Sequence, residues 1–325
     1  MFPTERPRRL RASQAIRNLV AESTVVPAQL ILPVFVKENL AEPRQIKGLP
    51  GVFQHNLDTL PAVVDQALEA GIGGIMVFGI PAERDAEGSQ ACNPNGILNA
   101  AIRKVRAQVG ERIVVIADLC LDEFTSHGHC GVLAADGSVD NDATLEAYSA
   151  MAVELAKAGA HMLGASGMMD GQVGVVRGAL DAAGFGNVSI LAYAAKYASA
   201  FYGPFRDAVE SELQGDRKTY QQDPRNLRES LREIRLDVEE GADIVMVKPA
   251  LSYLDVVREA RLSVDIPVAA YIVSGEMAML EAAAAAGLIE RERAILEMLH
   301  SVRRAGADII CTYWAIEASA LLRSN

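Results

Sequence analysis

The sequence lacks a long hydrophobic run and an excess of basic residues. No apolar stretch approaches the roughly 18 residues that a membrane-spanning helix needs, so we expect no membrane contact. Lysine and arginine together number 31, against 42 aspartates and glutamates, which gives a net charge of −11. Such an acidic balance argues against generic nucleic-acid binding. No apolar segment follows the basic N-terminal residues, so we expect no secretory signal.

Cysteine is also scarce, with four residues at Cys92, Cys120, Cys130 and Cys311. With no signal segment expected, this predicts a soluble, cytoplasmic protein whose reduced thiols serve metal binding or catalysis rather than disulfides. Hydrophobic residues make up 50% of the chain and charged residues 22%. A sequence of this composition buries a large core and has little tendency to disorder.

Strand-like apolar runs alternate with helical patterns along the chain. The expected strands are Leu30–Val36, Gly74–Ile80, Ile113–Leu119, His161–Ala165, Ser189–Tyr193, Asp243–Val247, Ile266–Val273 and Ala307–Thr312. The clearest helical patterns are Pro61–Ala70, Asn95–Val109, Thr144–Ala158 and Asn226–Glu240. Glycine follows each of these helices, and it is the usual stop signal at that position.

The connections between helix and strand repeat, which indicates one parallel sheet. Similar Gly-Ala turns join helix to strand at 158–160, 240–243 and 305–308. Strands that alternate with helices favour a closed (β/α)₈ TIM barrel over residues 29–325, with a doubly wound open sheet as the alternative. Residues 1–28 are polar and carry several arginines, so we expect an extended N-terminal arm that frays or packs on a neighbouring subunit.

Two lysines fall where a barrel places its chemistry, at the carboxyl ends of the strands. Lys196 follows the fifth expected strand, and Lys248 ends the sixth. Burial and a neighbouring positive charge both lower the pKa of a lysine, so one amine can be neutral near pH 7 and form a Schiff base with a carbonyl substrate. For either lysine alone, the alternative is an ammonium group that reaches water at the strand end.

An aromatic segment between the two lysines has the composition of a lid. It runs from Phe201 to Tyr220 and contains Arg206 and Arg217, with glycines as hinges. Arginine side chains bind carboxylates through two parallel hydrogen bonds, so such a lid would hold an acidic substrate. A solvated loop with scattered charges is the alternative.

The loop after the third expected strand concentrates possible metal ligands. Cys120, Asp122, His127, His129 and Cys130 lie within eleven residues. Two thiolates and a carboxylate would supply three ligands for Zn²⁺ and leave a fourth position open. The alternative is a loop with free cysteines.

These residues lie in long, specific motifs: FVKEN at 35–39, DLCLDEFTSHGHCG at 118–131, MMDG at 168–171, AAKYASAFYGPFRDA at 194–208, EGADIVMVKPA at 240–250, YIVSGE at 271–276 and TYWA at 312–315. The chain closely resembles the porphobilinogen synthase (δ-aminolevulinic acid dehydratase) family over essentially its whole length. The resemblance implies a (β/α)₈ barrel with an N-terminal arm and a homo-octamer. It also implies condensation of two molecules of 5-aminolevulinate to porphobilinogen, with loss of two waters, in tetrapyrrole (heme) biosynthesis.

The resemblance further implies a role for each candidate residue. Lys196 and Lys248 would be the two Schiff-base lysines. The residues matching the substrate contacts are Arg206, Arg217, Ser274, Tyr313, Asp118 and Ser166. The residues matching metal sites are Cys120, Asp122 and Cys130 for Zn²⁺ and Glu233 for an outlying Mg²⁺ at a subunit contact. A solvated helical carboxylate is the alternative for Glu233.

The chain departs from the family pattern in the metal loop and after the fourth strand. Zinc-type members carry three cysteines, and zinc-free members carry alanine and two aspartates, whereas this chain has Cys120, Asp122 and Cys130. From this mixed set we expect weak or substoichiometric zinc. Gly167 replaces the usual aspartate, and Ala165 replaces a proline.

Two rival functions are a class I aldolase and a non-catalytic assembly protein. The pair of lysines and the two lid arginines favour the condensation.

Overall fold

Eight parallel strands close into one barrel in the computed structural model, which describes residues 4–213 and 215–324. Residues 1–3 of the predicted arm, residue 214 of the predicted lid and residue 325 lie outside the described residues. The barrel strands are β1 (Leu30–Lys37), β4 (Gly74–Ile80), β5 (Val114–Leu119), β6 (Met162–Ala165), β7 (Ser189–Lys196), β8 (Ile244–Lys248), β9 (Val268–Ile272) and β10 (Ile309–Thr312). Because β10 pairs with β1, the ring of eight parallel strands is closed, which confirms the predicted barrel and excludes the open sheet.

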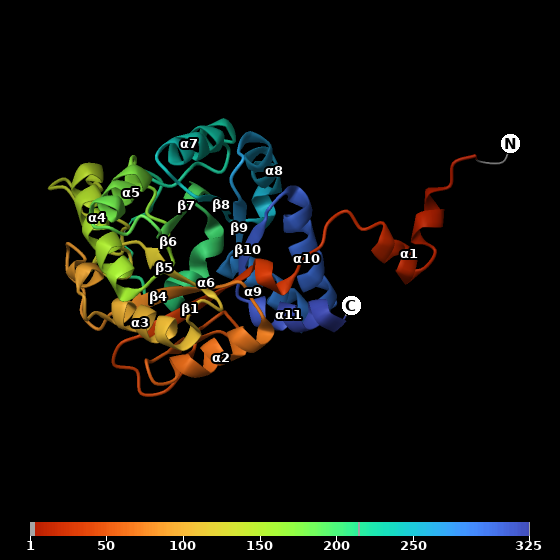
Figure 1. The fold of residues 1–325 in the computed structure, drawn as a ribbon, viewed down its shortest axis with the longest axis horizontal. Coiled ribbons are helices and arrows are strands. Elements are labelled where there is room, and N and C mark those ends of the chain that lie inside the picture. Colours follow the sequence, from red (N-terminus) through yellow and green to blue (C-terminus); the bar gives the residue numbers. More distant parts are fainter. Residues whose placement is uncertain (1–3, 214, 325) are drawn as a thin grey trace.

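Helices form a layer around the barrel (Figure 1). The principal ones are α2 (Leu60–Ala70), α3 (Ile97–Val109), α4 (Asn141–Ala158), α5 (Gln172–Ala182), α7 (Arg228–Glu239), α8 (Leu254–Ser263), α9 (Ser274–Ala285), α10 (Arg291–Ala305) and α11 (Ala315–Ser324). With one face on the core and one on helices, the strands are buried on both sides. This explains their continuous apolar runs in the sequence.

Strand β7 extends to Lys196, three residues beyond the predicted end at Tyr193. An irregularity in its pairing with β8 interrupts the regular alternation of inward and outward side chains on which the prediction depends. Ala192 pairs with Val245, but Ala195 pairs with Val247, so β7 contains one residue more than β8 between these two pairs. The extra residue brings Lys196 directly opposite Lys248. Bulges of this kind re-aim side chains and are frequent beside active sites.

Two short strands that the sequence did not reveal extend the barrel wall beside β1. Strands β2 (Arg44–Gln45) and β3 (Phe53–His55) form an antiparallel pair, and β3 lies parallel to the end of β1. Both are too short to give a periodic apolar pattern. They bring the segment after β1 to the rim of the barrel where the lysines lie.

The N-terminal arm extends beyond α10 and away from the barrel (Figure 1). It contains a 3₁₀ turn at Pro7–Arg11 and the helix α1 (Gln14–Leu19). Of residues 4–28, only Val25 is buried, and Leu19 is 85% exposed. The barrel therefore supplies almost no packing for the arm. No helix in the described part of the chain has the length and apolarity to cross a membrane.

Candidate active site

Lys248 ends β8 inside the barrel, where aromatic rings surround its amine. Its Nζ lies 4.4–5.6 Å from the centroids of four rings, those of Tyr193, Tyr202, Phe205 and Tyr271. The side chain is buried, and Nζ forms no hydrogen bond with the described residues. The sequence did not reveal this cage, since its rings come from two strands and from the lid.

Lys196 lies beside Lys248 but has a more polar environment. Its Nζ donates a hydrogen bond to the carbonyl oxygen of Ser166 at 2.6 Å. Burial alone would lower its pKa, but negative charge at Cys130, Cys120 and Asp122 outweighs burial and raises it. Lys196 therefore keeps its proton near neutral pH.

The pKa of Lys248 moves in the opposite direction. Burial, followed by the positive charge of Lys196, lowers the pKa of Lys248 to about 8. Asp118, on β5, is also buried, and burial together with the charge of Asp122 raises its pKa to about 7. A neutral amine and a carboxyl group that titrates near pH 7 are the groups that Schiff-base formation and proton transfer need.

The predicted metal ligands converge in the loop between β5 and α4. The sulfur atoms of Cys120 and Cys130 and a carboxylate oxygen of Asp122 all lie within 4.8 Å of one another and are buried. A hydrogen bond from Cys120 is the main reason that the pKa of Cys130 falls to about 7, so a thiolate is available near neutral pH. Two sulfurs and one carboxylate are a donor set that fits Zn²⁺.

The two histidines of this loop have other partners. His127 Nε2 lies 3.1 Å from the carbonyl oxygen of Ala86, and His129 Nδ1 lies 3.0 Å from the hydroxyl oxygen of Tyr220. Neither belongs to a convergent ligand group among the described residues.

Arg217 connects the lid to the metal loop. It donates hydrogen bonds to Asp122 Oδ2 at 2.9 Å and to the carbonyl oxygen of Gly128 at 2.8 Å. Burial would raise the pKa of Asp122, but Arg217 and Lys196 hold it well below its usual value. Arg217 Nε is buried without a hydrogen-bond partner in the described chain, as is Gln221 Nε2. These unpaired donors indicate a ligand site, and Gln221 is a candidate that the sequence did not single out.

The other predicted substrate contacts are distributed around the lid. The hydroxyl of Ser274 accepts a hydrogen bond from the backbone N–H of Phe205 at 2.9 Å, and Tyr313 stacks on Phe35 with 6.2 Å between ring centroids. Ser166 is buried beside Lys196. Arg206, on the short lid helix α6 (Gly203–Ala208), is exposed. The structure thus gathers the lysines, Arg217 and the metal loop, and leaves Arg206 at the surface.

A profile of the family described as delta-aminolevulinic acid dehydratase matches residues 4–321. The chain belongs to the delta-aminolevulinic acid dehydratase family. A relative of that name from Streptomyces coelicolor is 59% identical over 324 residues, which cover 99% of this chain and 98% of the relative. One from Mycobacterium tuberculosis is 56% identical over 323 residues, with the same coverage of 99% and 98%.

A solved structure from Toxoplasma gondii is also similar. It is delta-aminolevulinic acid dehydratase (porphobilinogen synthase) in complex with the reaction product porphobilinogen. It has a TM-score of 0.95 and 43% sequence identity, and the match covers 98% of this chain and 91% of that chain. The barrel of this family member is therefore similar to that of a dehydratase seen with its product.

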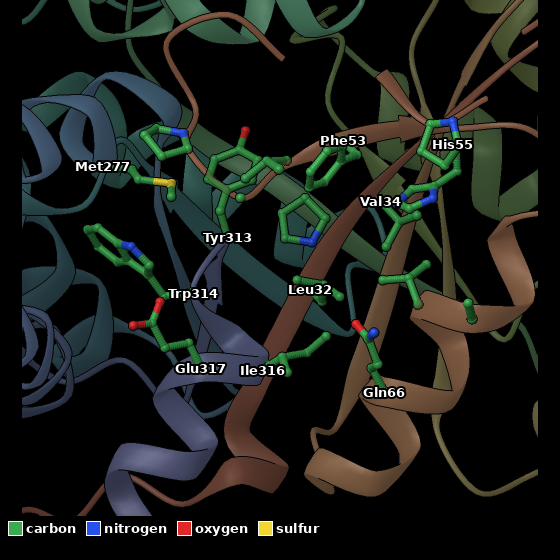
Figure 2. Close-up of a pocket in the computed structure, with 17 residues that line it drawn as sticks. Leu32, Val34, Phe53, His55, Gln66, Met277, Tyr313, Trp314, Ile316 and Glu317 are labelled. Carbon is green, nitrogen blue, oxygen red and sulfur yellow. The ribbon is translucent and has the colours of Figure 1, made fainter. Parts of the chain in front are cut away.

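Tyr313 also borders a second cavity, of about 500 Å³, outside the lysine site of this dehydratase family member. Figure 2 shows Tyr313, Trp314 and Met277 on one side of this cavity and His55 and Gln66 on the other. Neither lysine is among the described residues that line it. The cavity is largely apolar, and it supplies none of the amine chemistry.

Glu233, the predicted magnesium ligand of this family member, lines a different pocket at the barrel rim. Asp170 and Glu229 line the same pocket. Burial, followed by the charges of Asp170 and Glu229, raises the pKa of Glu233. Glu233 belongs to no group of three convergent metal ligands within the described residues.

Gly167, one of the departures from the family pattern, leaves room for Tyr148 of α4. A Cβ atom at Gly167 would lie 2.0 Å from the Tyr148 hydroxyl oxygen. That hydroxyl donates a hydrogen bond to the carbonyl oxygen of Cys130 and lies 3.8 Å from Cys120 Sγ. Tyr148 therefore supports the metal loop from behind, and a side chain at 167 would displace it.

We expect Gly167→Ala to lower the free energy of unfolding by about 1–3 kcal/mol, the usual effect of overpacking a core. Urea unfolding measures this change. Gly178→Ala is the matched control, because a Cβ at this exposed position in α5 meets nothing within 4 Å. The free energy of unfolding of the control variant should rise by up to about 1 kcal/mol. Equal stabilities of the two variants would contradict this account of Gly167.

Proposed function

We propose that this family member, a hydro-lyase, condenses two molecules of 5-aminolevulinate to porphobilinogen with loss of two waters, through Schiff bases on Lys248 and Lys196. The observation that carries the proposal is the pair of buried lysines in register on neighbouring strands, one with a pKa lowered to about 8 and the other with a raised pKa. The name and bound product of the Toxoplasma gondii structure support the same reaction.

Lys248 is the better nucleophile of the two lysines. Its neutral amine adds to the ketone carbon of one substrate, and the ketone oxygen leaves as water, which gives an imine. Lys196 holds the other substrate in the same way after it gives up its proton, and its positive charge before that step keeps Lys248 neutral. Asp118, whose pKa is raised to about 7, lies where it can exchange protons with these groups, and Ser166 lies beside it.

Arginines and hydroxyls bind the substrate carboxylates in this proposal. Arg217 still has an unpaired Nε–H, and Arg206 reaches the site when the lid is drawn over the substrate. The hydroxyls of Ser274 and Tyr313 serve the second carboxylate in this proposal. The unpaired donors of Arg217 and Gln221 support this assignment.

For the metal, we propose that Cys120, Asp122 and Cys130 hold Zn²⁺. When bound, Zn²⁺ would polarise a substrate carbonyl or amine beside the lysines. The carboxylate ligand makes the site weaker for zinc than three thiolates would, so we expect substoichiometric zinc after purification without chelators. Elemental analysis of that protein tests the proposal.

A second metal, Mg²⁺, is proposed at Glu233. The acidic pocket that Glu233 shares with Asp170 supports it, because Mg²⁺ usually keeps several waters and needs only one or two carboxylates from the protein. Activity measured with and without added Mg²⁺, in the wild type and in Glu233→Gln, tests this site.

The reaction itself is tested by incubating the protein with 5-aminolevulinate and detecting porphobilinogen colorimetrically. Formation of porphobilinogen supports the proposal. Absence of product with zinc and magnesium present contradicts it. Cleavage of a sugar phosphate instead would favour the aldolase alternative.

We also propose that the arm, residues 1–28, docks on a neighbouring subunit in a homo-octamer. Exposed apolar side chains at Leu10 and Leu19 support this, because the arm's own barrel does not cover them. Deletion of residues 1–20 should lower the assembly state in sedimentation velocity, while Arg17→Gln, which removes only a local contact, should not. An intact octamer after the deletion would show that the arm is dispensable.

A cytoplasmic location completes the proposal. The four cysteines are free thiols, although Cys120 and Cys130 lie close together. Two neighbouring thiols remain reduced only in a reducing compartment, and this supports an intracellular enzyme.

A further inference from the structure

Glu210, two residues after the lid helix α6, forms ion pairs with basic side chains from two other segments of the barrel rim. Its carboxylate accepts hydrogen bonds from Lys37 at the end of β1 and from Arg44 in β2. Gln54, in β3, lies 3.4 Å from the same carboxylate and accepts hydrogen bonds from Arg44. One side chain of the lid is thus tied to three strands that the sequence places more than 150 residues away.

The backbone around Glu210 is held at the same place. Arg84, in the loop after β4, donates hydrogen bonds to the carbonyl oxygens of Val209 at 2.7 Å and Glu210 at 2.6 Å. Gln54 donates one to the carbonyl oxygen of Ala208 at 2.7 Å. These contacts fix the carboxyl end of α6 on the β1–β4 side of the rim.

Glu210 also adopts a backbone conformation that favours glycine. Its φ is +52°, in the left-handed region that residues other than glycine, asparagine and aspartate seldom adopt. The surrounding contacts hold this residue in that conformation. A glutamate in a position suited to glycine indicates a function for its carboxylate.

Helix α6 is what these contacts hold in place. It has six residues, too few to be stable alone, and it carries Phe205 and Arg206. The ring of Phe205 lies 5.2 Å from Lys248 Nζ and packs on Phe78 with 5.4 Å between centroids. The position of α6 therefore decides whether the aromatic cage around Lys248 is complete.

We propose that Glu210 is a positioning residue, an ionic latch with Lys37 and Arg44 that holds α6 over Lys248. The latch keeps Phe205 in the cage, and it anchors the helix from which Arg206 reaches the substrate carboxylate when the lid closes. This inference rests on the proposed function for the role of Arg206. The FVKEN motif takes part in it through Lys37, which lies at the barrel rim without a role in the lysine chemistry.

The test compares Glu210→Gln with Glu111→Gln in the full-length protein. Glu111 forms an ion pair with Arg106 at 2.5 Å at the opposite end of the barrel, so its variant is the matched control. We expect Glu210→Gln to raise KM for 5-aminolevulinate about ten-fold with kcat within about two-fold, as loss of a binding-only contribution does. The control should leave both constants unchanged.

Hydrogen exchange without substrate measures the latch independently of the reaction. The backbone amides of residue 203 and residues 205–211 should exchange faster in Glu210→Gln than in the wild type, and those of the control should not. Unchanged exchange and unchanged KM in Glu210→Gln would overturn the latch. Faster exchange in a protein whose wild type makes no porphobilinogen would leave the latch standing and refute the proposed function.

Two further variants separate the carboxylate from the backbone. Glu210→Gly removes the carboxylate and relaxes φ, so it should fold at least as well as the wild type and still raise KM. Wild-type KM in this variant would overturn the proposal. Arg44→Gln should raise KM less in the Glu210→Gln background than in the wild type, because the two residues act through one contact. If the effects of the two substitutions on KM are fully additive, the latch is contradicted.

Discussion

Replacement of Lys248 with alanine is expected to lower the rate of porphobilinogen formation by at least about 10³-fold, because the pKa of Lys196, the neighbouring buried amine, is raised and its charged form cannot add to a carbonyl. Borohydride reduction in the presence of 5-aminolevulinate should trap an adduct on Lys248 in the wild type, and mass spectrometry of the digested protein locates it. Lys104→Ala, at a partly exposed position on α3 away from the site, is the control and should retain activity. Substantial activity in Lys248→Ala would refute the mechanism.

The same trapping experiment gives a pH profile. Only the neutral amine adds to a carbonyl, so trapping on Lys248 should rise as the pH increases through about 8. In Lys196→Met the neighbouring positive charge is lost, which raises the pKa of Lys248 and shifts the rise to higher pH. Burial, the larger cause of the lowered pKa, remains in this variant, so the pKa should stay below that of a free lysine. An unchanged profile in Lys196→Met would show that the two lysines do not interact.

Replacement of Asp122 with alanine is expected to lower the free energy of unfolding by about 3–5 kcal/mol, since it leaves Arg217 buried without its partner. The two side chains are 4% and 10% exposed and lie 2.9 Å apart. Because the folded pKa of Asp122 is lowered, this stabilisation is present at neutral pH and is lost as the pH falls below the usual carboxyl value. Urea unfolding at pH 7 measures the change.

Two comparisons control the Asp122 prediction. Lys157→Met breaks the exposed ion pair with Glu154 and should change stability by less than about 1 kcal/mol. The double variant Asp122→Ala/Arg217→Met removes both charges. Its free energy of unfolding should therefore be higher than that of Asp122→Ala alone. Equal losses in Asp122→Ala and Lys157→Met would contradict the buried pair. Asp122→Cys should instead bind zinc more tightly.

The barrel strands could be predicted because strands buried on both faces are continuous apolar runs, as Ile244–Lys248 illustrates. The neighbouring lysines followed from strand order, since consecutive strands of a barrel are adjacent. The end of β7 was not predicted, because its extra residue breaks the alternation on which a strand pattern depends.

The tertiary contacts of the site were beyond a sequence pattern. Arg217 and Asp122 are 95 residues apart, and neither position gives a signal that the two side chains meet. The cage around Lys248 needs the lid and two strands in their final positions. The support of the metal loop by Tyr148 depends on the space that Gly167 leaves for its hydroxyl, and no sequence pattern shows that space.

The extra residue in β7 means that the site is encoded by spacing as well as by residue identity. With regular pairing from Ala192 onward, Ala195 would face Lys248, and Lys196 would lie one position further along. An in-frame insertion of one codon after Ala194 would leave every lysine, arginine and cysteine of the site in the gene and yet move Lys196 one position beyond Lys248. A survey of variants that scores only whether the catalytic residues are present would count such an allele as intact.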